Sequence, residues 1–461
     1  MKFLTCLIAS LFFLSSILWA QPNKLINSGE IIERGSKLYD SGKYKQALLL
    51  YTQINRNDTN YVKALFARAL SSEADSQYDM TIKYCKEALS LNYQREYEPE
   101  LYNTYGNTLI DMHRYEEAVK IFDVGLSKYP SYSFLTFNKG IAYLNWDSVA
   151  KAEQLFQNTL LINPYLYSAH YQLGITALKQ GKLVEAFLSF VAYLIMYPDG
   201  KYERKSISIL SEISNGVDDI LEIKNKRTIE PAENYQSVED IVLSKIALDK
   251  AYKPIINLDD PISRQIQVVF EKLEYNEESA DFWMQYYIPF FKDIYNSGKF
   301  ELFINHAFSN INVAQIQDYN KKKKKELQSF VDDAAIYFNL IRSTRELFYK
   351  KRNSVTERYF FEKGDLVGKG GTLNNGKTII GLWHFYYPAG NIKSVGEFNN
   401  TGEKEGNWTF YYYSGKIEAN ENYKNGKLQG EQKNYFKNEA LSEDDSYTNG
   451  LLDGIDNTYY Y

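Results

Sequence analysis

A 34-residue periodicity in the first half of the chain constrains its fold more than any other feature of the sequence. Four kinds of residue recur at this spacing, and a fixed period of this length is typical of stacked supersecondary units. We interpret each copy as two antiparallel helices, with a small residue where they cross, a ring between them and a proline that ends the second helix. The recurring residues are Gly106, Gly140 and Gly174; Ala118, Ala152 and Ala186; Phe122, Phe156 and Phe190; and Pro130, Pro164 and Pro198.

This pattern resembles the tetratricopeptide repeat (TPR). In the register of that family, the close-contact positions are Gly140, Ala152 and Thr159 in one repeat and Gly174, Ala186 and Tyr193 in the next. Tyr193 replaces a residue that is usually small, so we expect the last repeat to pack differently against the chain that follows. Two weaker copies come earlier, and we expect about five repeats that form an all-α solenoid over residues 21–199. The earlier copies contain Gly35, Leu38, Tyr44, Ala47 and Tyr51, and then Ala67, Leu70, Tyr78, Cys85 and Ala88.

The resemblance implies a partner-binding surface on the concave side, which the first helix of each repeat forms. Asn103 and Asn107 lie one helical turn apart, and their amides can bind an extended peptide backbone through donor and acceptor groups. The alternative for the apolar positions is that they pack on neighbouring helices. Ser168 and Gln172 stand where some family members carry basic residues for a terminal carboxylate, which disfavours a clamp of that kind. The candidate partner-binding residues are Asn103, Asn107, Phe134, Phe137, Ile141 and Tyr171.

Residues 1–20 have the pattern of a secretory signal. Lys2 precedes the apolar run from Phe3 to Leu18, and Ala20 offers a cleavage point. Leu18 is larger than the residue usually found at its position, which leaves an uncleaved N-terminal anchor as the alternative. We therefore expect an exported protein of the periplasm, the cell envelope or the extracellular space. Cleavage would leave only Cys85, so no intramolecular disulfide is expected.

Residues 200–352 keep a helical spacing of apolar residues but lose the 34-residue register. Asp259, Asp260 and Pro261 predict a helix start, and Pro289 predicts a kink or a break in a ring-rich run that begins at Phe282. We interpret the segment as a helical extension packed on the last repeats, with a ligand pocket lined by the rings as the alternative. Lys321 to Lys325 are expected to be a solvated face or loop.

Residues 353–461 change to a glycine-rich pattern with alternating rings, which predicts an array of antiparallel β-hairpins. Turns such as Pro388-Ala389-Gly390-Asn391 and Asn425-Gly426 suit hairpins because glycine and asparagine tolerate positive φ. The array resembles the bacterial variant of the MORN repeat, whose members are often labelled antitoxin components. A cytoplasmic antitoxin needs no export signal, so we do not adopt that role. The repeated positions are Gly376, Gly402, Gly426 and Gly450; Gly381, Gly406, Gly430 and Gly454; and Tyr386, Tyr411, Tyr435 and Tyr459.

Alternation along the strands predicts a face that is aromatic in the early hairpins and polar in the late ones. We expect the early hairpins to dock on the helical part, with a carbohydrate- or lipid-binding strip as the competing interpretation. The last strand either closes the array at Tyr461 or marks an incomplete sequence. The face carries Trp383, Phe385 and Tyr387; Trp408, Phe410 and Tyr412; Gln432, Asn434 and Phe436; and Asp456, Thr458 and Tyr460.

Charge and motifs favour binding over catalysis. With 53 Lys and Arg against 58 Asp and Glu, the net charge of −5 argues against a nucleic-acid partner. The four histidines share no ligand spacing, and no phosphate-binding loop is present, so no metal or cofactor is expected. His170 occupies a helix-packing position, and Cys85 is expected to be buried and inert.

The sequence thus predicts an α+β multidomain protein that is not an enzyme. We expect a scaffold that binds a protein partner or an extended peptide through the solenoid and uses the β-array as a second contact surface. The alternatives are a peripheral membrane- or glycan-binding module that acts through the array and an enzyme hidden in the middle segment.

Overall fold

The computed structural model describes residues 27–343 and 356–460, apart from 92, 94, 229, 259, 277–278, 280, 363–364, 374–377, 388–389 and 455. The predicted export signal, Asp259, Gly376, the turn residues Pro388 and Ala389, and Tyr461 lie outside this part. The chain divides into two compact units, Met1–Tyr97 and Glu98–Tyr461. In the described part, no helix combines the length and the apolar character needed to cross a membrane.

The first unit consists of two helix pairs. Its helices are α2 (Ser28–Asp40), α3 (Tyr44–Tyr51), α4 (Tyr61–Ala74) and α5 (Tyr78–Leu89), followed by the 3-10 turn η1 (Arg95–Tyr97). The ring of Tyr51 lies on Gly35, where an added Cβ would come within 2.3 Å of it. The predicted crossing of the first repeat is therefore confirmed. Cys85 is fully buried, and burial raises the pKa of its thiol, which agrees with an inert packing role.

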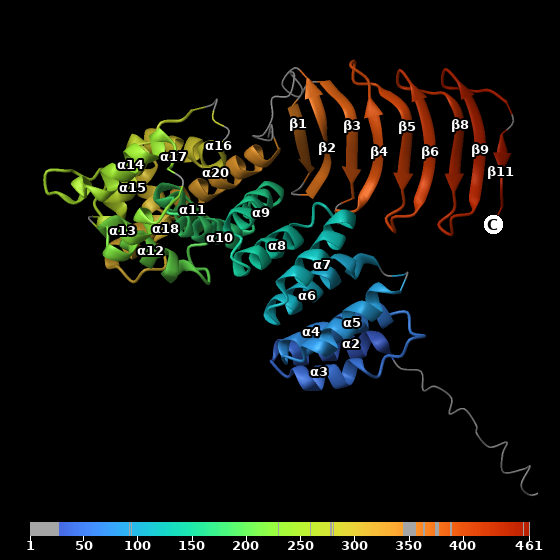
Figure 1. Ribbon diagram of the computed structural model, residues 1–461, viewed down its shortest axis with the longest axis horizontal. Coiled ribbons are helices and arrows are strands. Elements are labelled where there is room, and N and C mark those ends of the chain that lie inside the picture. The colour runs from blue at the N-terminus through green and yellow to red at the C-terminus, as the bar shows by residue number, and fades with distance from the viewer. Residues whose placement is uncertain are drawn as a thin grey trace, which may run out of the picture. The chain divides into compact units, whose positions relative to one another are not determined.

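The second unit begins with three more antiparallel helix pairs (Figure 1). Each second helix ends two residues before a repeated proline, as predicted. At each crossing, a phenylalanine ring covers a glycine: Phe122 on Gly106, Phe156 on Gly140 and Phe190 on Gly174. The pairs are α6 (Glu98–Asp111) with α7 (Tyr115–Lys128), α8 (Ser133–Asn145) with α9 (Val149–Ile162), and α10 (Tyr167–Lys179) with α11 (Leu183–Met196).

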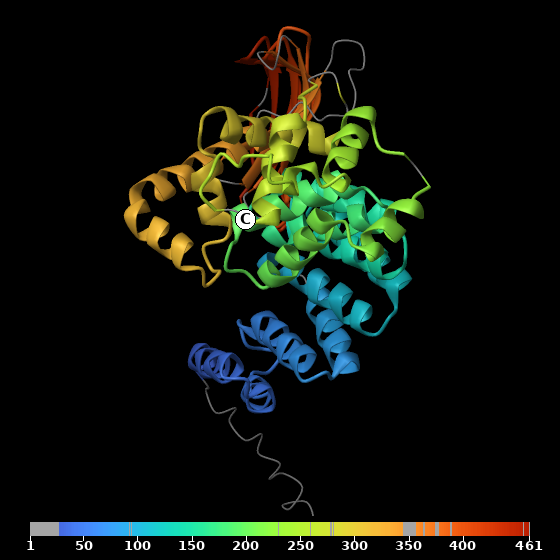
Figure 2. The ribbon, with the colours of Figure 1, turned by 90° about the vertical axis from the view of Figure 1, so that its left-hand side faces the viewer.

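The middle segment is helical and packs on the last repeat. Figure 2 shows its helices, drawn in green to orange, gathered around the end of the repeat helices. Helix α11 packs against three of them, α12, α14 and α18, and 13 of its 14 residues are buried. The segment comprises α12 (Glu203–Asn215), α13 (Asp218–Asn225), α14 (Glu233–Leu243), η2 (Ile246–Leu248), α15 (Pro261–Lys272), α16 (Phe282–Tyr286), α17 (Ile288–Asn296), α18 (Phe300–Ala307), α19 (Ala314–Lys322) and α20 (Lys324–Ser343).

Three details of this segment follow from its sequence. Helix α15 begins at Pro261, and the Asp260 carboxylate caps it by accepting from the backbone amides of Ile262 and Ser263 at 2.9 and 3.0 Å. The ring-rich run splits into α16 and α17, with Pro289 in the first turn of α17. The buried Tyr193 hydroxyl accepts from the backbone amide of Tyr202 at 2.9 Å, so this residue ties the last repeat to the next helix.

The C-terminal part is an antiparallel sheet of 11 strands among the described residues. Except at two short strands that pair off the main path, neighbouring strands follow chain order, as in a row of hairpins (Figure 1). The α+β architecture is confirmed, while the resemblance to MORN repeats stays a prediction. The strands are β1 (Thr356–Glu362), β2 (Asp365–Leu373), β3 (Thr378–Tyr386), β4 (Ile392–Phe398), β5 (Lys404–Tyr411), β6 (Ile417–Lys424), β7 (Lys427–Leu428), β8 (Gly430–Tyr435), β9 (Leu441–Thr448), β10 (Leu451–Leu452) and β11 (Asn457–Thr458).

Two tryptophans lie flat on glycines of the preceding strand. A Cβ added to Gly370 would lie 2.5 Å from the ring of Trp383, and one added to Gly396 would lie 2.1 Å from the ring of Trp408. Each indole donates to a backbone carbonyl at 3.1 Å, at Gly371 and Glu397 respectively. Each glycine thus leaves room for a ring to lie flat against the sheet, and both tryptophans are buried.

Candidate functional site

The predicted partner-binding residues lie on the first helices of three successive repeats. Asn103 and Asn107 are on α6, Phe134, Phe137 and Ile141 are on α8, and Tyr171 is on α10. Helices α6 and α8 pack against each other, so the first five of these residues belong to neighbouring helices. We call Asn103, Asn107, Phe134, Phe137 and Ile141 the first-helix face.

The amide of Asn103 is held by a residue that the sequence analysis did not single out. Asn138 on α8 donates from its Nδ2 to Asn103 Oδ1 at 2.7 Å. This bond leaves the amino group of Asn103 and the carbonyl oxygen of Asn138 for further hydrogen bonds. Both side chains are half-buried, as is Asn107 one turn further along α6. The face therefore presents amide groups in a fixed arrangement across two helices.

The three apolar residues of this face differ in exposure. The side chain of Phe134 is 43% exposed and lies 5.8 Å from the ring of Tyr132. Phe137 and Ile141 are half-buried against the core, and the Phe137 ring lies 5.5 Å from that of Phe156. Phe137 and Ile141 therefore contribute to packing, whereas Phe134 is exposed.

Tyr171 is 8% exposed because the chain after α11 covers it. The ring of Tyr202 stacks on it, with 4.1 Å between centroids and 5° between planes. Tyr197 stacks on Tyr167 of the same helix in a similar way, at 4.0 Å. The continuation of the chain thus occupies the part of the surface that α10 contributes, and the first-helix face lies on α6 and α8.

The rings of the middle segment form a core. Tyr286, Tyr287 and Phe291 are buried, and Trp283 donates from its indole to Ser189 Oγ at 2.8 Å. His170 lies against the same cluster. Its Nδ1 lies 2.6 Å from the Tyr287 hydroxyl and its Nε2 lies 2.9 Å from the Pro164 carbonyl oxygen. Burial lowers the pKa of His170 to about 4, so the ring is neutral and structural at physiological pH, as predicted.

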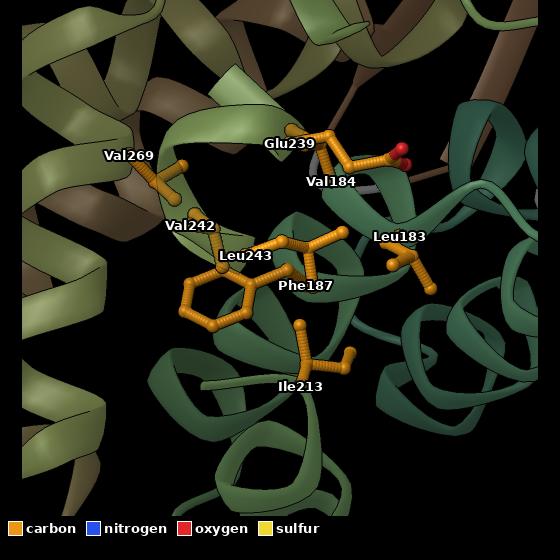
Figure 3. A pocket seen from close by; sticks show the side chains of 8 residues that line it. All are labelled: Leu183, Val184, Phe187, Ile213, Glu239, Val242, Leu243 and Val269. Atoms are coloured by element: carbon orange, nitrogen blue, oxygen red, sulfur yellow. The ribbon is translucent and has the colours of Figure 1, made fainter. Parts of the chain in front are cut away.

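A small pocket opens between α11, α12, α14 and α15, and Figure 3 shows the side chains around it. The lining is apolar except for Glu239. That carboxylate accepts from Arg227 at 2.7 and 2.9 Å and pairs with Lys224 at 3.2 Å. Its charge is therefore neutralised, and the pocket presents no second titratable group. The lining residues are Leu183, Val184, Phe187, Ile213, Glu239, Val242, Leu243 and Val269.

Glu185 on α11 is a separate buried acid. Burial raises the pKa of its carboxyl to about 8, and its Oε2 has no hydrogen-bond partner among the described residues. Nearby, Lys182 donates to both oxygens of Glu153 at 2.9 Å, and its ammonium lies 5.5 Å from the Trp283 ring centroid. Glu185 does not line the pocket. An acid–base site requires a group of shifted pKa inside a cavity. Here the carboxyl of raised pKa and the pocket are separate.

The aromatic face of the sheet is packed on itself. Trp383 and Trp408 are each 2% exposed, and the rings of Phe385 and Phe398 lie 6.0 and 5.0 Å from that of Trp408. The Lys404 ammonium lies 4.4 Å from the centroid of Trp408, and burial lowers the pKa of this lysine. These rings therefore support the array and are not an open strip.

No family model matches the chain. It is similar to solved structures that include TTC0263, a thermophilic TPR protein of Thermus thermophilus, at 19% identity and a TM-score of 0.35 over 40% of this chain and 99% of that one. YrrB, a TPR protein with an unusual peptide-binding site, has 15% identity and a TM-score of 0.31 over 39% and 90%. PilF of Pseudomonas aeruginosa has 18% identity and a TM-score of 0.33, over 43% of this chain and 97% of that one. The structural neighbours of the N-terminal half are thus TPR proteins.

Proposed function

We propose that this chain is a non-catalytic scaffold that binds a protein partner through the first-helix face. The observation that carries the proposal is the combination of an exposed ring, Phe134, with the hydrogen-bonded amides of Asn103 and Asn138 on two adjacent helices. An aromatic anchor beside oriented donors and acceptors suits an extended peptide segment, which needs both an apolar contact and partners for its backbone.

The rest of the repeat surface supports this assignment. Tyr171 is covered by Tyr202, and α11 is buried under the middle segment, so α10 and α11 are engaged within the chain. On α6 and α8, Phe134 is exposed, and among the described residues no side-chain hydrogen bond occupies the Asn107 amide. Within the first-helix face, Phe134 is therefore the exposed residue, and the half-buried Asn107 is an amide without a side-chain hydrogen bond among the described residues.

The proposal includes export and a second contact through the β-array. Export rests on the charged and apolar start of the sequence. For the array, a membrane- or glycan-binding strip requires accessible rings, and Trp383 and Trp408 are 2% exposed. We therefore assign the main contact to the helical face and a supporting contact to the array.

The test is capture of partners from the native envelope with an Asn107→Ala, Phe134→Ala double variant. Val124→Ala is the matched control, because Val124 is 46% exposed on α7, a second helix of the repeats. We expect the double variant to lose one stoichiometric protein and to bind it about ten-fold or more weakly when purified, as for an interface anchor. The control should bind like the wild type. Equal recovery by the double variant, at unchanged helix content, would contradict the proposal.

A further inference from the structure

Three carboxylates converge at the last strands of the β-array. Glu443 and Asp445 are two residues apart on β9, so their side chains share a face of the sheet. Strand β11 pairs antiparallel with β9 through Asn457 opposite Asp444, which brings Asp456 opposite Asp445. One carboxylate oxygen from each of Glu443, Asp445 and Asp456 lies within 4.8 Å of the other two.

Asp445 is the unusual member of this cluster. Its side chain is 7% exposed, and its buried Oδ1 has no hydrogen-bond partner among the described residues. Leaving a buried carboxylate oxygen unpaired costs free energy. Among the residues that the structure describes, no lysine or arginine forms an ion pair with Glu443, Asp445 or Asp456. Two other carboxylates, those of Glu443 and Asp456, thus lie close to the buried Asp445, and no ion pair among the described residues balances their charge.

We propose that Glu443, Asp445 and Asp456 bind a calcium ion. The donors are all oxygen atoms, which suits a hard divalent cation, and the three carboxylates supply its charge balance. Asn434 donates from its Nδ2 to Glu443 Oε2 at 2.6 Å, which orients that carboxylate in the way outer hydrogen bonds orient metal ligands. Magnesium requires near-ideal octahedral geometry, whereas calcium accepts irregular oxygen ligands, including water at the exposed Asp456 side.

The cluster replaces a feature of the earlier hairpins. There, the ring of Trp383 lies on Gly370 and the ring of Trp408 lies on Gly396, which joins neighbouring strands. At the end of the array, Asp456 and Asp445 face each other instead. A bound ion would bridge the short strand β11 and β9, in place of the ring that joins the earlier strands. It would thereby hold β11 in the sheet.

With three carboxylates and an open side, we expect a dissociation constant on the order of 10⁻⁴ to 10⁻³ M, typical of extracellular calcium modules.

The test uses the full-length, metal-free protein. Calorimetric titration with calcium chloride gives the affinity, and terbium luminescence sensitised by tyrosine reports ion binding independently. The variants are Asp445→Asn and Asp456→Asn. Asp456 is exposed, so its substitution leaves folding intact. Asp444→Asn is the control, because it removes the same charge from the same strand on the opposite face.

We expect wild type and Asp444→Asn to bind calcium and to gain thermal stability from it. Asp456→Asn and Asp445→Asn should bind at least about ten-fold more weakly, and Asp445→Asn without metal should be no less stable than the wild type. Absence of calcium binding by the wild type up to about 5 mM, or equal affinity in all four proteins, would overturn the proposal. Equal displacement of terbium by magnesium and calcium would overturn the assignment to calcium.

Discussion

At the scale of single residues, His170 shows how a repeat position determines chemistry. Its Nε2 donates to the Pro164 carbonyl oxygen, so its Nδ1 accepts from the Tyr287 hydroxyl and the ring is a fully bonded neutral imidazole. The packing role was predicted because His170 falls within the 34-residue register. Its bond to Tyr287 was not predicted, since that residue is 117 positions away in the chain.

His170 should make the protein less stable in mild acid. Its pKa is lowered to about 4 in the folded state against about 6.5 when unfolded, so its contribution is fully present above about pH 6.5 and is lost as the pH falls toward 4. The loss amounts to about 3 kcal/mol. We expect the unfolding free energy of His170→Gln to fall less steeply with decreasing pH in this window than that of the wild type. The difference in slope should correspond to about one bound proton.

Tyr287→Phe is the control for that measurement, because it removes the hydroxyl but keeps the titrating ring. Its slope between pH 4 and 6.5 should resemble that of the wild type, even if its stability is lower. If the wild type and His170→Gln had identical slopes, His170 would be protonated to the same degree in the folded and the unfolded protein, contrary to its lowered pKa.

The Asn103–Asn138 pair illustrates what residue patterns miss. Asn138 is one position out of register with Asn103, because 34 residues separate Asn103 from Phe137. The 34-residue spacing therefore relates Asn103 to Phe137 and gives no indication of Asn138. The hydrogen bond depends on how α6 and α8 lie against each other, which requires the three-dimensional structure.

At the scale of elements, the glycine–ring crossings explain why the helix pairs were predictable. Close approach of two helices requires a residue without a side chain, and the ring that fills the space recurs 16 positions later in each copy. Local pattern and tertiary contact therefore coincide. The hairpins were predictable for a similar reason, because turn glycines and ring alternation repeat together.

A side chain at Gly140 should separate α8 from α9. A Cβ there would lie 2.7 Å from Phe156 Cε1, so Gly140→Val forces the ring out of its position. We expect a loss of about 1–3 kcal/mol, as for other overpacked cores, in denaturant unfolding. Gly29→Ala is the control, because Gly29 is exposed in α2 and the nearest atom to an added Cβ is 3.4 Å away.

Adding Phe156→Leu to Gly140→Val should restore part of the lost stability, because the smaller side chain makes room for the added atoms. If the two substitutions were simply additive, the overlap between Gly140 and Phe156 would not be the cause.

The sheet shows where pattern reading of an element stops. Alternation indicated that Trp383 and Trp408 share a face, but it left open whether that face is exposed. Their burial depends on Gly370 and Gly396, which lie on neighbouring strands and were outside the repeated turn positions. The carboxylate cluster of Glu443, Asp445 and Asp456 was not predicted either, because strand pairing creates it and sequence spacing does not reveal it.

At the scale of the whole molecule, the helical repeats use some of their surface internally and leave some of it free. The middle segment covers α11, and Tyr202 covers Tyr171, so the sequence of the extension decides which repeats remain available. The sequence predicted a partner-binding face across three repeats. It could not predict this coverage, because the extension has no register that indicates where it folds back.

The most direct test of the account is site-specific photocrosslinking of the full-length protein in the native envelope. A photoreactive phenylalanine analogue would replace Phe134 on the first-helix face or, as the control, Val124 on α7, since both side chains are similarly exposed at 43% and 46%. We expect one crosslinked protein at position 134, which is absent at position 124 and suppressed by Asn107→Ala. Crosslinking that is equal at the two positions, or found only at position 124, would contradict a partner-binding role for this face.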